Sequence, residues 1–182
     1  MKDVVWPLIL VFAASFFLQL PGCKNSDKEQ KTVAPLSIDR LHQLFIDNFT
    51  PFLVDMEDPT VQGKFATALD QFNIEYWTGK YQDAISDFKN LDSAQQQTNS
   101  LKFRYANALL ANAQFEDARI VFQEIINHGP SLHANESVWY LALIEIQQGN
   151  IEKARHLLKA YRNSMNPLLG RQADNLLIAL GK

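Results

Sequence analysis

The chain has 182 residues, with 17 basic and 20 acidic side chains that give a formal net charge of −3. The basic residues form no stripe, which excludes the electrostatic footprint of a nucleic-acid-binding protein. A single cysteine excludes an internal disulfide, so apolar packing must hold the fold together. The length is ordinary for one domain with its own core once a leader is set aside.

The N-terminal end of the chain has the composition of an export signal. Lys2 precedes an apolar run over residues 4–20, and this pattern is typical of a secretory signal peptide. The run ends in LPGC (residues 20–23), which resembles the lipobox of bacterial lipoproteins. The resemblance implies cleavage before Cys23 and a covalent lipid, such as palmitate, on its thiol. Pro21 departs from the small or aliphatic residue that the lipobox prefers.

The region before the fold is predicted to have two parts. Residues 1–22 are the expected signal peptide, and residues 23–36 are the lipidated cysteine with a disordered linker, because residues 24–35 are polar and charged. Two alternatives remain open: an uncleaved anchor helix, and a plain signal peptide that leaves Cys23 free. Because two or more acyl chains hold a protein stably at a bilayer, we expect a lipid-anchored protein of the bacterial cell envelope, attached to the outer membrane. The alternative is an inner-membrane anchor facing the periplasm.

Residues 37–64 are predicted as an N-terminal helix and a connection. Apolar residues recur at three- and four-residue steps over residues 38–49, and Ser37 is a candidate N-cap. The sequence TP at residues 50–51 ends this helix, because the residue before a proline disfavours helical backbone. The sequence DP at residues 58–59 offers a new N-cap and a first-turn proline, which predicts that the next helix begins there.

Three later segments align without gaps: residues 79–88, 113–122 and 149–158. Each segment has, in order, a small residue, a polar residue, a large apolar residue, a polar residue, a charged residue and an alanine. A large apolar residue follows four positions after that alanine. The aligned alanines are 34 and then 36 residues apart. This pattern resembles the tetratricopeptide repeat (TPR), a helix-turn-helix unit of about 34 residues. The resemblance implies an all-α, right-handed α-solenoid of about three repeats, with residues 65–182 forming the repeats and a C-terminal capping helix.

The resemblance assigns structural roles to small residues where the two helices of a repeat meet. The matching positions are Ala84, Ala118 and Ala154 in the second helices, Ala106 and Ala142 in the first helices, and Pro130 at a repeat end. Phe72 stands at the small first-helix position of repeat one, so we expect a more open helix pair there. Residues 168–180 form one more amphipathic pattern, and a solenoid needs such a capping helix.

Proteins of this repeat family bind polypeptides in a groove lined by their first helices, so the resemblance implies a protein partner, either a peptide or a helix. The groove positions carried over to this chain are Leu69, Asn73, Tyr76, Trp77, Phe103, Asn107, Leu110, Trp139, Leu143 and Ile146. They include no cation, so capture of a carboxylate is not expected, and aromatic anchors favour a hydrophobic segment. Two alternatives stay open: the aromatic residues pack between repeats, or the N-terminal segment fills the groove.

The sequence offers no enzyme motif. It has no Gly-rich phosphate loop and no G-x-S-x-G elbow, so no catalysis, cofactor or small-molecule substrate is predicted. His128 and His133 lack the i, i+4 spacing of a zinc pair, and we expect solvated loop histidines. The acidic cluster at residues 55–58 lacks the further ligands and central glycine of a calcium loop, so no metal site is predicted.

The leading functional prediction is a membrane-tethered, non-catalytic protein-interaction scaffold of the cell envelope, in an assembly, export or signalling complex. One alternative is a chaperone-like accessory of protein secretion that an uncleaved helix holds at the inner membrane. Another is a non-catalytic subunit of an envelope enzyme complex. Cleavage before Cys23 distinguishes the first two, and stoichiometric copurification with an enzyme identifies the third.

Overall fold

Every regular element in the described part of the chain is a helix, so the protein is all-α as predicted. The computed structural model describes residues 36–53, 58–59, 67–162 and 167–181. All of them belong to the unit that spans residues 33–182. The predicted signal peptide, Cys23 and the linker lie outside the described residues, as does most of the acidic cluster at residues 55–58.

The helices of the described residues are α1 (Ile38–Asn48), α2 (Ala68–Trp77), α3 (Tyr81–Phe88), α4 (Ser93–Gln96), α5 (Asn99–Ala111), α6 (Phe115–Asn127), α7 (Leu132–Gln147), α8 (Ile151–Arg162) and α9 (Pro167–Ala179). Helix α9 coincides within one residue with the helix predicted over residues 168–180. The four-residue helix α4 was not predicted. None of the described helices combines the length and the apolar character that a membrane span requires.

Side-chain caps fix where several helices begin. Ser37 accepts a hydrogen bond from the Arg40 amide at 3.2 Å, which confirms it as the N-cap of α1. Thr67 and Asp70 form a reciprocal capping box at the start of α2, and the backbone of Thr67 is extended. A helix that runs unbroken from residue 59 is therefore wrong, because the capping box satisfies the free amides of a helix that starts at Ala68.

Three pairs of helices pack side by side: α2 with α3, α5 with α6, and α7 with α8. The turn inside each pair has the same geometry. Gly79, Ala113 and Gly149 have positive φ angles of 77°, 57° and 77°. Their amides bond to the carbonyl three residues back at 3.2, 3.1 and 3.0 Å, and the next amides bond five residues back at 2.8, 2.9 and 2.9 Å. These are the two hydrogen bonds of a Schellman turn, in which the left-handed residue ends the helix.

The small residues predicted for the helix contacts lie in the core. The five alanines with 0% exposure that the prediction named are Ala84, Ala106, Ala118, Ala142 and Ala154. Phe72, at the position predicted to open the first pair, is also fully buried, and its ring lies 5.7 Å from the ring of Phe88. Pro130 is exposed before α7. The core is thus built from small residues where helices approach closely and from large rings elsewhere.

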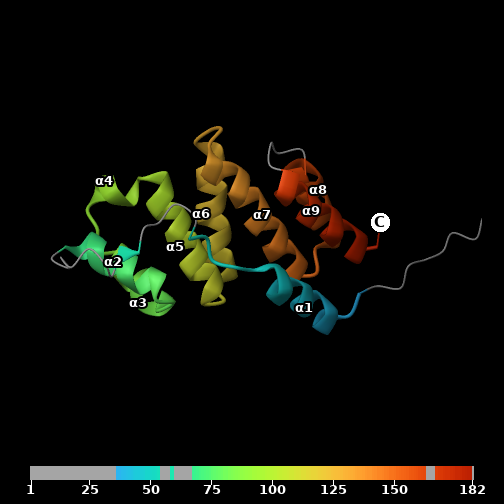
Figure 1. Cartoon of the computed structure of the whole chain (residues 1–182), viewed down its shortest axis with the longest axis horizontal. Helices are drawn as coiled ribbons and strands as arrows, with labels where there is room; N and C mark the ends of the chain where they lie inside the picture. The colour runs from blue at the N-terminus through green and yellow to red at the C-terminus, as the bar shows by residue number, and fades with distance from the viewer. Residues whose placement is uncertain (1–35, 54–57, 60–66, 163–166, 182) are drawn as a thin grey trace, which may run out of the picture. The chain divides into compact units, whose positions relative to one another are not determined.

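Each helix pair packs against the next pair, and α9 packs against α8. Helix α1 breaks this order, because it lies against α7, far along the chain (Figure 1). Leu41, Leu44 and Phe45 of α1 are buried in this contact, but Ile38, which the apolar pattern placed on the same side, is 81% exposed. That part of the helical pattern is therefore wrong, and the packed stripe of α1 begins at Leu41.

Candidate binding surfaces

The first candidate surface is made by α2, α5 and α7, and residues 36–53 lie on it. We call these residues the arm. Beyond α1, the arm continues without helix through residues 49–53. The Phe52 ring lies 5.2 Å from Phe103 on α5, and the Phe49 ring lies 6.1 Å from Tyr140 on α7, both edge to face. Such pairs add to the burial of apolar area, so the arm is held by its rings.

Two tyrosine hydroxyl groups bind the backbone of the arm. Tyr76 on α2 donates to the carbonyl of Phe52 at 2.9 Å, and Tyr140 on α7 donates to the carbonyl of Thr50 at 2.7 Å. Both tyrosines are buried, and burial raises the pKa of Tyr140. The Tyr140 hydroxyl therefore stays protonated at neutral pH, and both hydroxyls act as donors to the arm.

The helical part of the arm lies along the C-terminal half of α7. Leu41 approaches the turn at Gly149, and the His42 ring nitrogen Nδ1 lies 3.1 Å from Gln147 Oε1. The Phe45 ring stands 5.6 Å from Phe115, the first residue of α6. The helical part of the arm therefore contacts both the α5–α6 pair and the α7–α8 pair.

The arm and the core bury most of the predicted groove. Seven of its ten residues are buried, namely Tyr76, Phe103, Asn107, Leu110, Trp139, Leu143 and Ile146, and Leu69, Asn73 and Trp77 are partly exposed. Tyr76 and Phe103 contact the arm directly. Trp139 instead packs on the Tyr161 ring of α8 at 5.3 Å. A partner can reach the buried part of this surface only where the arm is not in place.

Polar groups of the predicted groove are largely used inside the chain. Asn73 accepts from Arg104 Nη1 at 3.2 Å, and Asn107 donates to the Phe103 carbonyl at 2.9 Å. The oxygen Oδ1 of Asn107 is buried and has no hydrogen-bond partner among the described residues. Sequence reasoning left open that aromatic residues pack between helix pairs, but it missed the hydroxyl contact of Tyr140, which only the tertiary structure reveals.

The prediction of solvated histidines is wrong for His133. This residue lies in α7, partly buried, and its ring is 4.9 Å from Phe103 and 6.2 Å from Phe52. His128 is exposed beyond α6, with Nδ1 at 2.7 Å from the Glu124 carbonyl. Within the residues described, no three metal-ligating side chains gather into one cluster.

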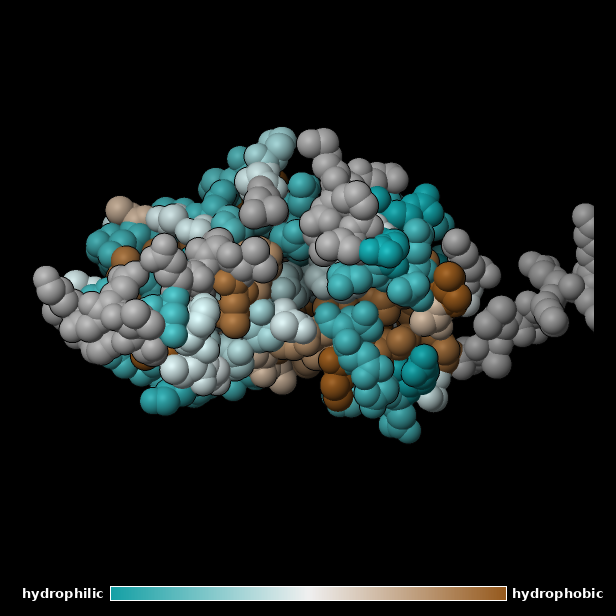
Figure 2. Space-filling view, viewed as in Figure 1, coloured by the Kyte–Doolittle hydropathy of each residue, from teal (hydrophilic) through white to brown (hydrophobic). Residues whose placement is uncertain are grey.

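The second candidate surface is a groove of about 570 Å³ between α6 and α8, with α7 as its floor. We call it the α6–α8 groove. Its apolar lining comes from Ile120, Leu141 and Leu157. Ile120 is 57% exposed although it is a large apolar side chain. Figure 2 shows one face of the molecule, on which the exposed apolar residues gather mainly in the half that carries α1. A groove with an apolar floor and an exposed apolar wall suits the side chains of a partner.

Charged side chains surround the α6–α8 groove. Glu124 accepts from Lys102 Nζ at 3.1 Å, so this acid is already paired. Lys153 and His156 line the α8 wall. Among the described residues, Lys153 has no ion-pair partner, so the uncommitted charge at the groove is positive.

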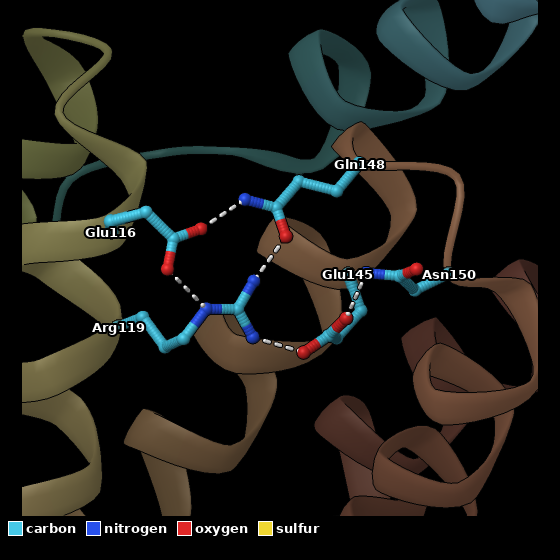
Figure 3. A network of polar contacts seen from close by, with 5 residues as sticks. All are labelled: Glu116, Arg119, Glu145, Gln148 and Asn150. Atoms are coloured by element: carbon cyan, nitrogen blue, oxygen red, sulfur yellow. Dashed lines mark hydrogen bonds and ion pairs between the residues drawn. The ribbon is translucent and has the colours of Figure 1, made fainter.

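A polar network joins α6 to α7 beside the groove (Figure 3). Its members are Glu116, Arg119, Glu145, Gln148 and Asn150. Arg119 Nε lies 3.2 Å from Glu116 Oε2, and its two terminal nitrogens bind Glu145 and Gln148. Asn150 donates to the second oxygen of Glu145 at 2.8 Å. The buried carboxylate of Glu145 is thus fully paired, as a buried charge requires.

The hydrogen bond from Gln148 and the charge of Arg119 hold the pKa of Glu116 below its usual range. A contrasting acid lies deeper, where Glu136 accepts from the Tyr161 hydroxyl at 2.9 Å. Burial raises the pKa of Glu136, and the hydrogen bond opposes this in part. Glu136 does not line the groove, and its contacts join α7 to α8.

Comparison with known proteins identifies no relative of this chain. No protein-family model, curated protein or solved structure matches this chain.

Proposed function

We propose that this protein is a membrane-tethered, non-catalytic protein-interaction scaffold of the bacterial cell envelope. The observation that carries the proposal is the open α6–α8 groove, in which Ile120 presents a large apolar side chain to solvent beside Leu141 and Leu157. Apolar grooves with a charged rim are typical of protein-binding surfaces. The arm covers much of the surface made by α2, α5 and α7. The α6–α8 groove, in contrast, is open to a partner without any change in this structure.

We further propose that the three helix pairs are TPR-like repeats of a short solenoid. The equivalent Schellman turns and the buried alanines support this, as do contacts that recur between pairs. The side-chain amide of Asn112, after α5, donates to Gln82 on α3 at 2.7 Å. Gln148, after α7, donates in the same way to Glu116 on α6. A recurring contact between successive pairs is what a solenoid requires.

The membrane tether is proposed from the sequence, because residues 1–35 lie outside the described structure. A lipid on Cys23, after cleavage before it, would anchor the protein, in the outer membrane by the leading prediction. The intact mass of membrane-extracted protein tests this. We expect a chain that begins at a lipidated Cys23, whereas a chain that begins at Met1 with an unmodified cysteine contradicts the tether.

The scaffold proposal is tested by photo-crosslinking in living cells. A photoreactive amino acid replaces Ile120 in the α6–α8 groove, and in a second strain it replaces Ile178 on α9. The two isoleucines are matched, at 57% and 63% exposure, so they differ mainly in whether they line the groove. We expect a defined protein adduct from position 120 and none from position 178.

Two outcomes contradict the use of this groove. One is the absence of any protein adduct from position 120, and the other is the same adducts from both positions. The exchange Ile120→Asp provides a second readout, because a charge on the groove wall should abolish copurification of the crosslinked partner, while Ile178→Asp should leave it unchanged.

A further inference from the structure

We propose that the partner segment in the α6–α8 groove places an aromatic ring over Leu141 and a carboxylate beside Lys153. This chemistry rests on the proposed use of the groove by a protein partner, and it names what that partner presents. It follows from two equivalent places in the fold, of which one is filled by a side chain of this chain and the other is open.

The two equivalent places lie on either side of α6. Helix α5 packs against α3 and α6, and α7 packs in the same way against α6 and α8. The buried alanines of these two helix pairs correspond at a spacing of 36 residues. At this spacing Tyr105 corresponds to Leu141, and Asp117 corresponds to Lys153. The two places therefore share a framework and differ in these side chains.

The chain fills the place between α3 and α6 with an aromatic ring of its own. The Tyr105 ring of α5 stacks on Phe88 of α3, with the ring centroids 4.1 Å apart and the planes at 8°. Burial raises the pKa of Tyr105, and the nearby charge of Asp117 on α6 raises it further. The side chain of Tyr105 thus lies against α3 and close to α6. An aromatic ring is therefore a group that this framework accommodates.

The place between α6 and α8 is the α6–α8 groove. Its floor carries Leu141, which is 4% exposed and does not extend as far as a tyrosine ring. Ile120 and Leu157 stand on the two walls, around an open volume of about 570 Å³. A volume of this order is typical of pockets that enclose most of a small ligand. A partner ring that enters the groove would therefore bury apolar surface against its floor and both walls.

The charge on the wall is reversed between the two places, because Lys153 stands where Asp117 stands. Glu124 on the opposite wall is paired with Lys102 at 3.1 Å, and Arg119 belongs to the network of Figure 3. In the part of the chain that the structure describes, the exposed Lys153 enters no ion pair. A carboxylate of the partner would gain an ion pair at this wall, whereas a cation would be repelled.

The test uses the purified full-length protein and a phage library of random dodecapeptides. Peptides are kept only if Ile120→Asp abolishes their binding and Ile178→Asp does not, which restricts the selection to the groove. We expect the kept peptides to share an aromatic residue and an acidic residue. Kept peptides without an aromatic residue, or with a basic residue in place of the acid, overturn the proposal. A selection that yields no peptide dependent on Ile120 also overturns it.

Charge reversal tests the carboxylate. A kept peptide should bind Lys153→Glu about fivefold more weakly than the native protein, because an attraction becomes a repulsion. Exchange of the acidic residue of the peptide for lysine should restore binding to this variant. Lys159→Glu is the matched control, since Lys159 is also exposed on α8 but does not line the groove. Equal binding to Lys153→Glu and to the native protein would overturn the assigned charge.

A filled groove tests the ring. Leu141→Tyr gives the floor the side chain that stands at Tyr105, and it should weaken peptide binding by about tenfold or more. Leu141→Met conserves volume and should leave binding unchanged. Unchanged binding to a folded Leu141→Tyr variant would contradict the assigned ring. If that variant fails to fold, the peptide sequences and the exchange at exposed Lys153 still decide the proposal.

The results separate this chemistry from the scaffold role. A cellular protein adduct from position 120, together with peptides that lack the expected residues, would leave the scaffold standing and remove only the aromatic and acidic assignment. Peptides with the expected residues, together with no cellular adduct, would uphold the chemistry of the groove and contradict its use as a scaffold.

Discussion

Arg119 and Arg155 make equivalent contacts in successive helix pairs. Each follows a buried alanine of a second helix and pairs with a glutamate three residues earlier. Arg119 then reaches Glu145 and Gln148 at the end of α7, and Arg155 reaches the carbonyls of Leu180 and Gly181 after α9, at 2.5 and 2.6 Å. Helix α9 therefore packs against α8 in the position that α7 takes against α6.

The paired state of Glu145 predicts opposite effects for two matched exchanges. Glu75 is the equivalent residue of the first pair. Among the described residues no helix pair precedes α2 to supply an arginine, and Glu75 Oε2 is buried with no hydrogen-bond partner there. We expect Glu145→Gln to lower the free energy of unfolding by about 1–2 kcal/mol, because an amide NH₂ would face the donors of Arg119 or Asn150. Glu75→Gln should raise it. Chemical denaturation measures both, and a loss of stability in both variants would contradict this account.

The increase in the free energy of unfolding that we expect from Glu75→Gln should depend on pH. Burial, with Asp87 nearby, raises the pKa of Glu75 above its ordinary value of 4.5. The folded state then binds more protons than the unfolded state, so this group destabilises the protein as pH rises through the raised pKa. The advantage of the glutamine should be full at pH values above that pKa and should vanish below about 4.5. Thermal melting of both proteins from pH 4 to pH 8 checks this, and a constant difference would refute the ionisation.

Ala113 occupies a backbone conformation that favours glycine. Its φ of 57° matches the turns at Gly79 and Gly149, and a left-handed residue with a side chain costs about 1–2 kcal/mol. We expect Ala113→Gly to raise the free energy of unfolding by about 0.5–1 kcal/mol. The reverse exchange Gly79→Ala, where a new Cβ meets nothing within 4 Å, should lower it by a similar amount. Denaturant midpoints that move in any other direction would contradict equivalent turns.

Ala118 has 0% exposure on α6, the second helix of its pair. Ala118→Asp would bury a charge there and should cost several kcal/mol, about 3 or more. Ala160→Asp on the exposed face of α8 is the matched control and should cost about 0.5 kcal/mol from helix propensity alone. Thermal melting compares the two, and similar midpoints would show that Ala118 does not lie at a tight contact.

Features set by neighbouring residues could be predicted from the sequence, whereas features set by distant residues could not. The Ser37 cap and the buried alanines of the helix pairs follow from local spacing. The capping box at Thr67 was also readable, but the apolar pattern around it outweighed this signal. The hydroxyl contact from Tyr140 to Thr50 spans 90 positions, and no local pattern encodes it.

The prediction of the groove did not include what covers its positions. Trp139 faces Tyr161 rather than a partner because the contact between α7 and α8 takes its side of the helix. The α6–α8 groove was missed because Ile120 reads as an ordinary member of an apolar stripe. Its 57% exposure depends on how far apart α6 and α8 lie, which spacing along the chain does not determine.

The place of the arm has a consequence for synthesis of the chain. The arm leaves the ribosome before the helix on which it docks, since Thr50 precedes its partner Tyr140 by 90 positions. At about 5–20 residues per second, this interval lasts roughly 5 to 20 s. During that time the docking surface of Phe45, Phe49 and Phe52 is incomplete, because Tyr140 and the rest of α7 have not been made. The newly made segment is therefore an exposed aromatic stretch, of the kind that chaperones bind until the later helices are complete.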